Sequence, residues 1–70
     1  MAEVKRIVAD FTPEAYEVLS DVAQQLNTSK ADALRRALGL ANFILRQQKE
    51  GWRVILEHEK DKVRKELVTP

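Results

Sequence analysis

The hydrophobic pattern changes period near residue 11. Before that point, the apolar residues Ile7, Ala9 and Phe11 occupy odd positions. A period of two places them on one face of a β-strand, which we expect to face the core. The opposite face carries the even positions, Val4, Arg6, Val8 and Asp10. The pattern predicts a single N-terminal strand.

A helix is predicted directly after this strand. Thr12 is a typical N-cap, and Pro13 suits the first helical position because its missing N–H would have no partner there. Apolar residues then recur every three or four positions, which is typical of an amphipathic helix: Ala15, Leu19, Val22, Ala23 and Leu26. The helix is expected to run to about Leu26 and to end at Asn27, which tolerates the left-handed conformation.

A second, longer helix begins after a tight turn. Ser29 with Asp32 fits a capping pattern, and Thr28 is the competing cap. The helix is expected to continue to about Glu50, with Gly51 as its C-cap. Its apolar stripe comprises Ala33, Leu34, Ala37, Leu38, Ala41, Ile44, Leu45 and Gln48.

The last twenty residues read as an extension. Trp52–Leu56 and Val63–Val68 are β-prone, and we expect them to pair as a short hairpin, with Trp52 as the core anchor and His58 in a solvated turn. No Gly or Asn marks a tight turn between them, so a helix over residues 57–63 remains an alternative.

The single strand has no partner within the first thirteen residues. Unpaired backbone groups are costly, and a chain of 70 residues without cysteine cannot rely on disulfides. The simplest partner is a second copy of the chain. We therefore expect a homodimer joined by an intermolecular antiparallel ribbon, a structure that fits the DNA major groove.

Composition narrows the function. Apolar residues make up 44% of the chain, which is typical of a folded domain. With no Cys, one His and dispersed carboxylates, we expect neither an enzyme nor a cofactor or metal. No apolar run is long enough for a membrane span, and no signal peptide is recognisable, so we expect a cytoplasmic protein without a membrane partner.

The net charge is only +1, so a DNA-binding protein of this composition must gather its cations on one face.

The order of these elements resembles the ribbon-helix-helix (MetJ/Arc/CopG-like) family of DNA-binding proteins. The resemblance lies in Arg6–Glu14 and Leu26–Leu34 and spans roughly residues 4–47. It implies a mainly α fold with one N-terminal strand, in which residues 1–50 form an intertwined homodimeric DNA-binding domain. Residues 51–70 are a C-terminal extension beyond that domain.

By position, the resemblance implies which residues contact DNA. The base readers are Arg6, Val8 and Asp10, and the phosphate anchors are Thr28, Ser29 and Lys30. Lys5 lies on the core side of the predicted strand, where its chain can extend to phosphate.

Each of these residues can also be explained without a contact to DNA. Arg6 can bind guanine bidentately or be solvated, and Val8 can contact a thymine methyl or only favour the strand. Asp10 departs from the neutral or basic residue usual in the family; it accepts from cytosine or pairs with Arg6 or Lys5. The second helix start can bind an anion or be a plain cap. Arg35 and Arg36 either reach the DNA backbone or pair with Asp32.

The leading hypothesis is a sequence-specific transcriptional regulator, a repressor, that binds double-stranded DNA as a homodimer, with two or more dimers on a repeated operator. Two alternatives stay open. One is an antitoxin that represses its own operon and masks a toxin with its tail. The other is a dimeric interaction module without DNA binding.

Overall fold

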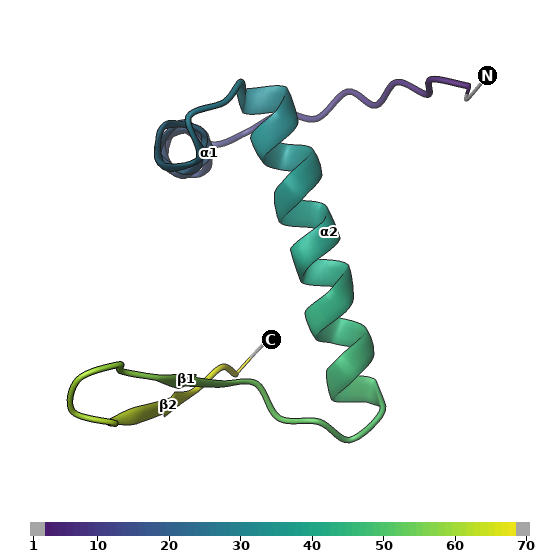
Figure 1. Cartoon of the computed structure of the whole chain (residues 1–70). Helices are drawn as coiled ribbons and strands as arrows, with labels where there is room; N and C mark the ends of the chain where they lie inside the picture. Colours follow the sequence, from purple (N-terminus) through teal and green to yellow (C-terminus); the bar gives the residue numbers. More distant parts are fainter. Residues whose placement is uncertain (1–2, 69–70) are drawn as a thin grey trace. The chain divides into compact units, whose positions relative to one another are not determined.

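The computed structural model describes residues 3–68. The chain forms two units, residues 1–34 and 35–70. The elements follow one another as helix α1 (Pro13–Leu26), helix α2 (Lys30–Lys49), strand β1 (Ile55–Glu57) and strand β2 (Arg64–Glu66) (Figure 1). Both predicted helices and the predicted hairpin are therefore present.

Helix α1 begins as its sequence predicts. Thr12 is extended (φ −65°, ψ 158°), and its Oγ1 accepts the backbone N–H of Ala15 at 3.1 Å. Its carbonyl accepts the first helical bond, from Tyr16 N–H at 2.9 Å. Pro13 occupies the first turn, where it removes no hydrogen bond.

Asn27 ends α1 in the left-handed conformation, with φ 53° and ψ 50°. Its N–H donates to Gln24 O at 3.0 Å, and the N–H of Thr28 donates to Ala23 O at 3.0 Å. These two bonds satisfy the last carbonyls of the helix and turn the chain toward α2.

This cap supplies a stability prediction. Asn27→Ala should lower the free energy of unfolding by about 1 kcal/mol, because a Cβ without a compensating amide is strained at this φ. Asn27→Gly should retain or slightly raise stability, since glycine adopts the conformation without strain. Urea unfolding of the two variants at equal protein concentration measures the difference. Equal losses for Ala and Gly would contradict the backbone explanation.

Helix α2 is capped by Ser29 rather than by Thr28. Ser29 Oγ accepts the N–H of Asp32 at 3.1 Å, and its carbonyl accepts Ala33 N–H at 2.9 Å. At the other end Gly51 has φ 98°, and its N–H donates to Gln48 O at 3.1 Å. Both predicted caps of this helix are confirmed.

The tail is a hairpin and not a helix. β1 and β2 pair antiparallel, with Leu56 opposite Lys65. Lys62 takes the positive φ (61°) that the turn needs, and its N–H donates to His58 O at 2.9 Å. Asp61 Oδ1 accepts Val63 N–H at 3.1 Å. Side-chain acceptors thus stabilise a turn that contains neither Gly nor Asn. The Trp52 side chain is 66% exposed, so its predicted role as the core anchor is wrong.

The predicted N-terminal strand, and with it the intermolecular ribbon, is wrong. Residues 3–12 are extended but form no strand, and the sheet found among residues 3–68 is the C-terminal hairpin within one chain. Ile7, expected to face the core, is 86% exposed, and Val8, expected to face outward, is 88% exposed. The alternating pattern specifies an extended backbone, but a strand also needs a partner for its hydrogen bonds.

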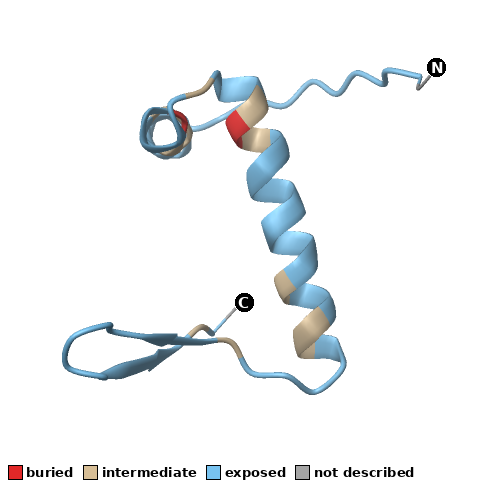
Figure 2. Ribbon diagram, viewed as in Figure 1, coloured by how far each residue is buried: buried red, intermediate tan, exposed pale blue. Residues whose placement is uncertain are grey.

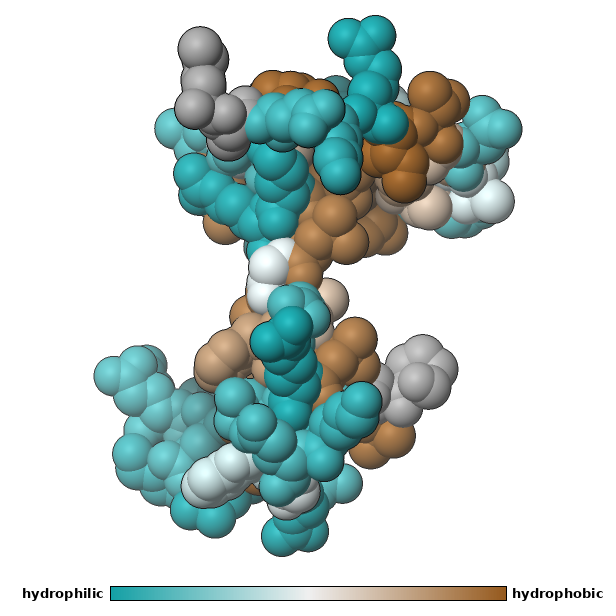
Figure 3. Space-filling view, turned by 90° about the vertical axis from the view of Figure 1, so that its right-hand side faces the viewer, coloured by the Kyte–Doolittle hydropathy of each residue, from teal (hydrophilic) through white to brown (hydrophobic). Residues whose placement is uncertain are grey.

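Little of the described chain is buried. Ala23 of α1 and Ala33 of α2 are the buried residues, at 5% and 0% exposure (Figure 2). Every residue from 35 to 43 is exposed, although this part of α2 contains Leu38, Leu40 and Phe43. Brown apolar atoms consequently lie on the surface in Figure 3. The helices present apolar faces that the described chain does not cover.

Candidate nucleic-acid interface

The start of α2 brings three of the predicted DNA-contacting residues together. Thr28, Ser29 and Lys30 follow one another across the cap. The Thr28 hydroxyl is half-buried and donates to Asp32 Oδ2 at 2.8 Å. Ser29 Oγ already accepts the N–H of Asp32. Both hydroxyls therefore have intrachain roles, and phosphate would have to compete for them.

Lys30 is held by an aromatic ring. Its Nζ lies 5.4 Å from the ring centroid of Tyr16 on α1. A cation over an exposed ring is stabilised by about 0.5–1 kcal/mol. This contact positions the ammonium group without neutralising it, which leaves it able to bind an anion.

Asp32 changes the electrostatics of this helix end. A carboxylate in the first turn stabilises the positive end of the helix dipole. The same carboxylate repels an approaching phosphate. The start of α2 is therefore a capped, internally satisfied helix end with Lys30 as its available cation.

The remaining predicted residues lie on the extended segment before α1, which we call the arm (residues 3–11). Lys5, Arg6, Val8 and Asp10 are all exposed. Among the described residues, no hydrogen bond or ion pair involves Lys5, Arg6 or Asp10, so the pairing of Asp10 with either cation, one of its two predicted alternatives, is not formed. No bond links the arm's side chains to Thr28, Ser29 or Lys30 either. The structure places the two predicted groups separately within residues 3–34.

Charge is divided unequally between the two units. Residues 1–34 contain three Lys or Arg and six Asp or Glu, a net charge of −3. Residues 35–70 contain nine and five, a net charge of +4. The predicted DNA-contacting residues all belong to the negative unit. Any polyanion must therefore approach the cations of the arm and Lys30 while avoiding the carboxylates.

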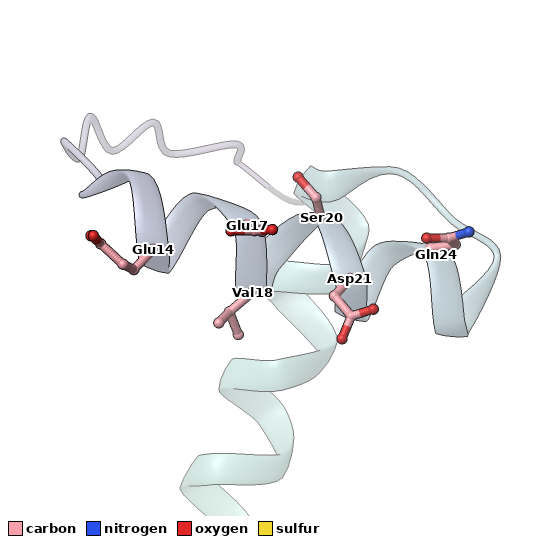
Figure 4. Close-up of a pocket in the computed structure, with 6 residues that line it drawn as sticks. All are labelled: Glu14, Glu17, Val18, Ser20, Asp21 and Gln24. Atoms are coloured by element: carbon pink, nitrogen blue, oxygen red, sulfur yellow. The ribbon is translucent and has the colours of Figure 1, made fainter.

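Three of those six carboxylates lie on one face of α1, a feature that sequence reasoning did not single out. The acidic face comprises Glu14, Glu17, Val18, Ser20, Asp21 and Gln24, which line a shallow depression (Figure 4). The signal was present as acids spaced three and four residues apart in a helix without Lys or Arg. Because all six residues come from one helix, the depression has a single wall and cannot enclose a cofactor.

Comparison with family models, curated proteins and solved structures finds no match for this chain. Residues 3–68 contain no cluster of three or more His, Cys, Asp or Glu that could hold a metal ion. None of the described helices is both long and apolar enough to cross a membrane. The features of the described residues that bear on function are therefore the arm, the apolar helix faces and the charges.

Proposed function

We propose that this protein is a DNA-binding transcriptional regulator that acts as a homodimer. The observation that carries the proposal is the arm: an exposed, extended segment bearing Lys5 and Arg6, with no partner strand in the described chain. Nine extended residues span up to about 30 Å, close to one turn of B-DNA at about 34 Å. Such an arm can follow a groove and place a guanidinium on a base edge. This function accords with the cytoplasmic location expected from the sequence.

Uncovered surface supports the homodimer. Every residue of α2 from 35 to 43 is exposed, including Leu38, Leu40 and Phe43 at 62%, 62% and 61%. Clustered exposed apolar side chains of this size are typical of a surface that a partner covers. A second copy is the simplest partner that covers this surface.

The face of α2 is the part of that surface best suited to self-association. At 100° per residue, five of its apolar residues fall within an arc of roughly 120°: Ala37, Leu38, Ala41, Ile44 and Leu45. Leu38 and Leu45 are 62% and 52% exposed. Two copies that pair through this stripe would cover it without involving the arm.

The proposal is tested first with random duplex DNA. At low salt the protein should bind, and the logarithm of the affinity should fall linearly with the logarithm of the salt concentration, at about 0.9 per phosphate contacted. Fluorescence anisotropy of a labelled duplex over a salt series measures both quantities. No binding at low salt contradicts the proposal.

Lys30 supplies a more specific prediction. Lys30→Gln should weaken binding to all duplexes by a similar factor and reduce the salt slope by about 1, because a phosphate contact carries no base information. The matched control is Lys49→Gln, the same change at the far end of α2. If both variants lower affinity equally, the effect reflects net charge and Lys30 is not an anchor.

One alternative function has specific support. Asp32 at the start of α2 and the net charge of −3 in residues 1–34 favour an interaction module without DNA binding. The same duplex titration decides between DNA binding and an interaction module without it.

The antitoxin alternative is less favoured, because the tail forms its own ladder, including Leu67 N–H to Val54 O at 2.8 Å. Hydrogen exchange of the free protein tests it, since an antitoxin tail that folds on a toxin should be unprotected alone.

A further inference from the structure

Strand β1 forms an open edge of the hairpin. The sheet found among residues 3–68 has two strands, so each strand has a neighbour on one side only (Figure 1). Val54 O and His58 N–H each form a 2.8 Å hydrogen bond with the returning chain. In an antiparallel ladder, residues that bond to the partner strand alternate with residues whose N–H and C=O point away from it. Ile55 and Glu57 therefore present their backbone groups on the open side of β1.

The two edges of the hairpin differ in how far they are protected against pairing. The three residues of β2 are all charged, Arg64, Lys65 and Glu66. Charged residues, lysine especially, commonly protect an edge strand from pairing with another chain. In β1, by contrast, Ile55 and Leu56 are apolar and are 41% and 60% exposed. Because an isolated two-stranded hairpin is marginally stable in water, a further strand would stabilise it, and β1 is the edge that can accept one.

The segment around β1, Arg53-Val-Ile-Leu-Glu57, is complementary to itself when it runs antiparallel to a second copy. With Ile55 opposite Ile55, Arg53 lies opposite Glu57, and Val54 lies opposite Leu56. Apolar residues then face apolar residues, and each charge faces the opposite charge, which stabilises a ladder. Moving the centre by one residue in either direction places a charged side chain opposite Ile55. The side chains therefore select one register.

The ion pairs within the hairpin fit this register. Arg64 Nε lies 3.0 Å from Glu57 Oε1, and Arg53 Nη1 lies 3.4 Å from Glu66 Oε1. The side chains of Arg53 and Glu57 remain 78% and 41% exposed. In the paired sheet, Glu57 would lie between Arg64 of its own chain and Arg53 of the second copy. Opposite charges would thus alternate from strand to strand across this row.

We propose that β1 pairs antiparallel with β1 of a second copy, centred on Ile55, and joins the two hairpins into one continuous sheet. The residues whose backbone groups point outward then exchange hydrogen bonds across the new ladder. The contact is isologous, since the same segment lies on both sides of the two-fold axis. It uses neither the arm nor the apolar stripe of α2 and needs no DNA, so it can fail while the proposed function stands.

Residue-resolved hydrogen exchange by NMR, on the full chain at rising protein concentration, tests which edge is paired. The amides of Ile55 and Glu57 should become at least about tenfold more protected, because they donate only to the second copy. The amides of Arg64 and Glu66, which point outward at the other edge, are the control within the same molecule and should stay unprotected. Equal protection at both edges, or no gain at Ile55 and Glu57, overturns the proposal.

Single cysteine variants test the register, since the chain contains no cysteine. Ile55→Cys should form a disulfide between two copies under mild oxidation, because opposed hydrogen-bonded residues have Cα atoms about 5.5 Å apart. Leu56→Cys is the matched control. Its position is more exposed, at 60% against 41%, but in this register two copies of residue 56 are diagonal neighbours about 7–8 Å apart, beyond disulfide range. If Leu56→Cys forms the disulfide as readily as Ile55→Cys, or if neither does, the register is overturned.

Charge reversal tests the two ends of the segment. Arg53→Glu and Glu57→Arg each place like charges opposite one another and should lower the concentration-dependent protection of Ile55 at least about fivefold. Mixing the two variants should restore this protection, since the acidic segment of one faces the basic segment of the other. The pairs with Glu66 and Arg64 within each chain cannot explain recovery, because mixing leaves them unchanged. Circular dichroism confirms that each variant is folded, and a mixture without recovery overturns the proposal.

Discussion

Replacing Leu38 and Leu45 together by glutamate is expected to abolish the homodimer that we propose. Both side chains lie on the apolar stripe of α2 and are more than half exposed in the single chain. Burying a leucine contributes about 1.5–3 kcal/mol, and the dimer would bury four of them. The dissociation constant should therefore rise by at least about 10⁴-fold.

Dissociation should also lower stability. The single chain has Ala23 and Ala33 as its buried residues among those described, too few to stabilise a domain alone. The wild-type Tm should rise with protein concentration, whereas the Tm of the double variant should be low and independent of concentration. Analytical ultracentrifugation and thermal unfolding over a concentration series measure both effects.

The matched control places glutamate on the polar side of the same helix. Asn42→Glu lies close in sequence to Leu45 but outside the apolar stripe, and it should leave the dimer intact. If the control and the double variant dissociate equally, the change in charge and not the apolar stripe is responsible. A wild-type chain that is a stable monomer at all concentrations contradicts the homodimer itself.

The second large effect is expected at Arg6. Arg6→Ala should lose roughly 1–3 kcal/mol at the preferred site and relax base preference, because it removes the proposed bidentate contact with guanine. Binding-site selection from random DNA at a stated salt concentration first defines the preferred site. Titration of that site and of a random duplex then separates specific from non-specific affinity.

Arg6→Lys is the matched control for charge. Lysine keeps the positive charge but lacks the planar fork of arginine. Affinity for the random duplex should be retained, while affinity for the preferred site should fall. If Arg6→Ala binds every sequence as the wild type does, the arm does not read bases.

Local signals predicted the helices and their ends. Thr12, Asn27, Ser29 and Gly51 each act on backbone groups no more than four positions away, so their roles can be read from the chain itself. The hairpin followed from β-prone residues on either side of a polar turn. The details of that turn did not, because Lys62 adopts a conformation that lysine rarely takes.

The candidate site was predicted only in part. The sequence indicated that Thr28, Ser29 and Lys30 lie together, because they are adjacent at a helix start. It did not indicate that Thr28 would donate to Asp32 or that Lys30 would lie over Tyr16. Those contacts depend on rotamers and on how the turn brings the start of α2 to α1.

By itself, the sequence predicted two capped amphipathic helices, a C-terminal hairpin with a helix as its alternative, and a strand in the segment before the first helix. Tertiary structure decided that this segment is not a strand and that Ile7 is exposed. The physical reason is the range of the interactions. Caps and helical hydrogen bonds close within a few residues, whereas pairing of a strand and burial of an apolar side chain depend on partners that periodicity does not specify.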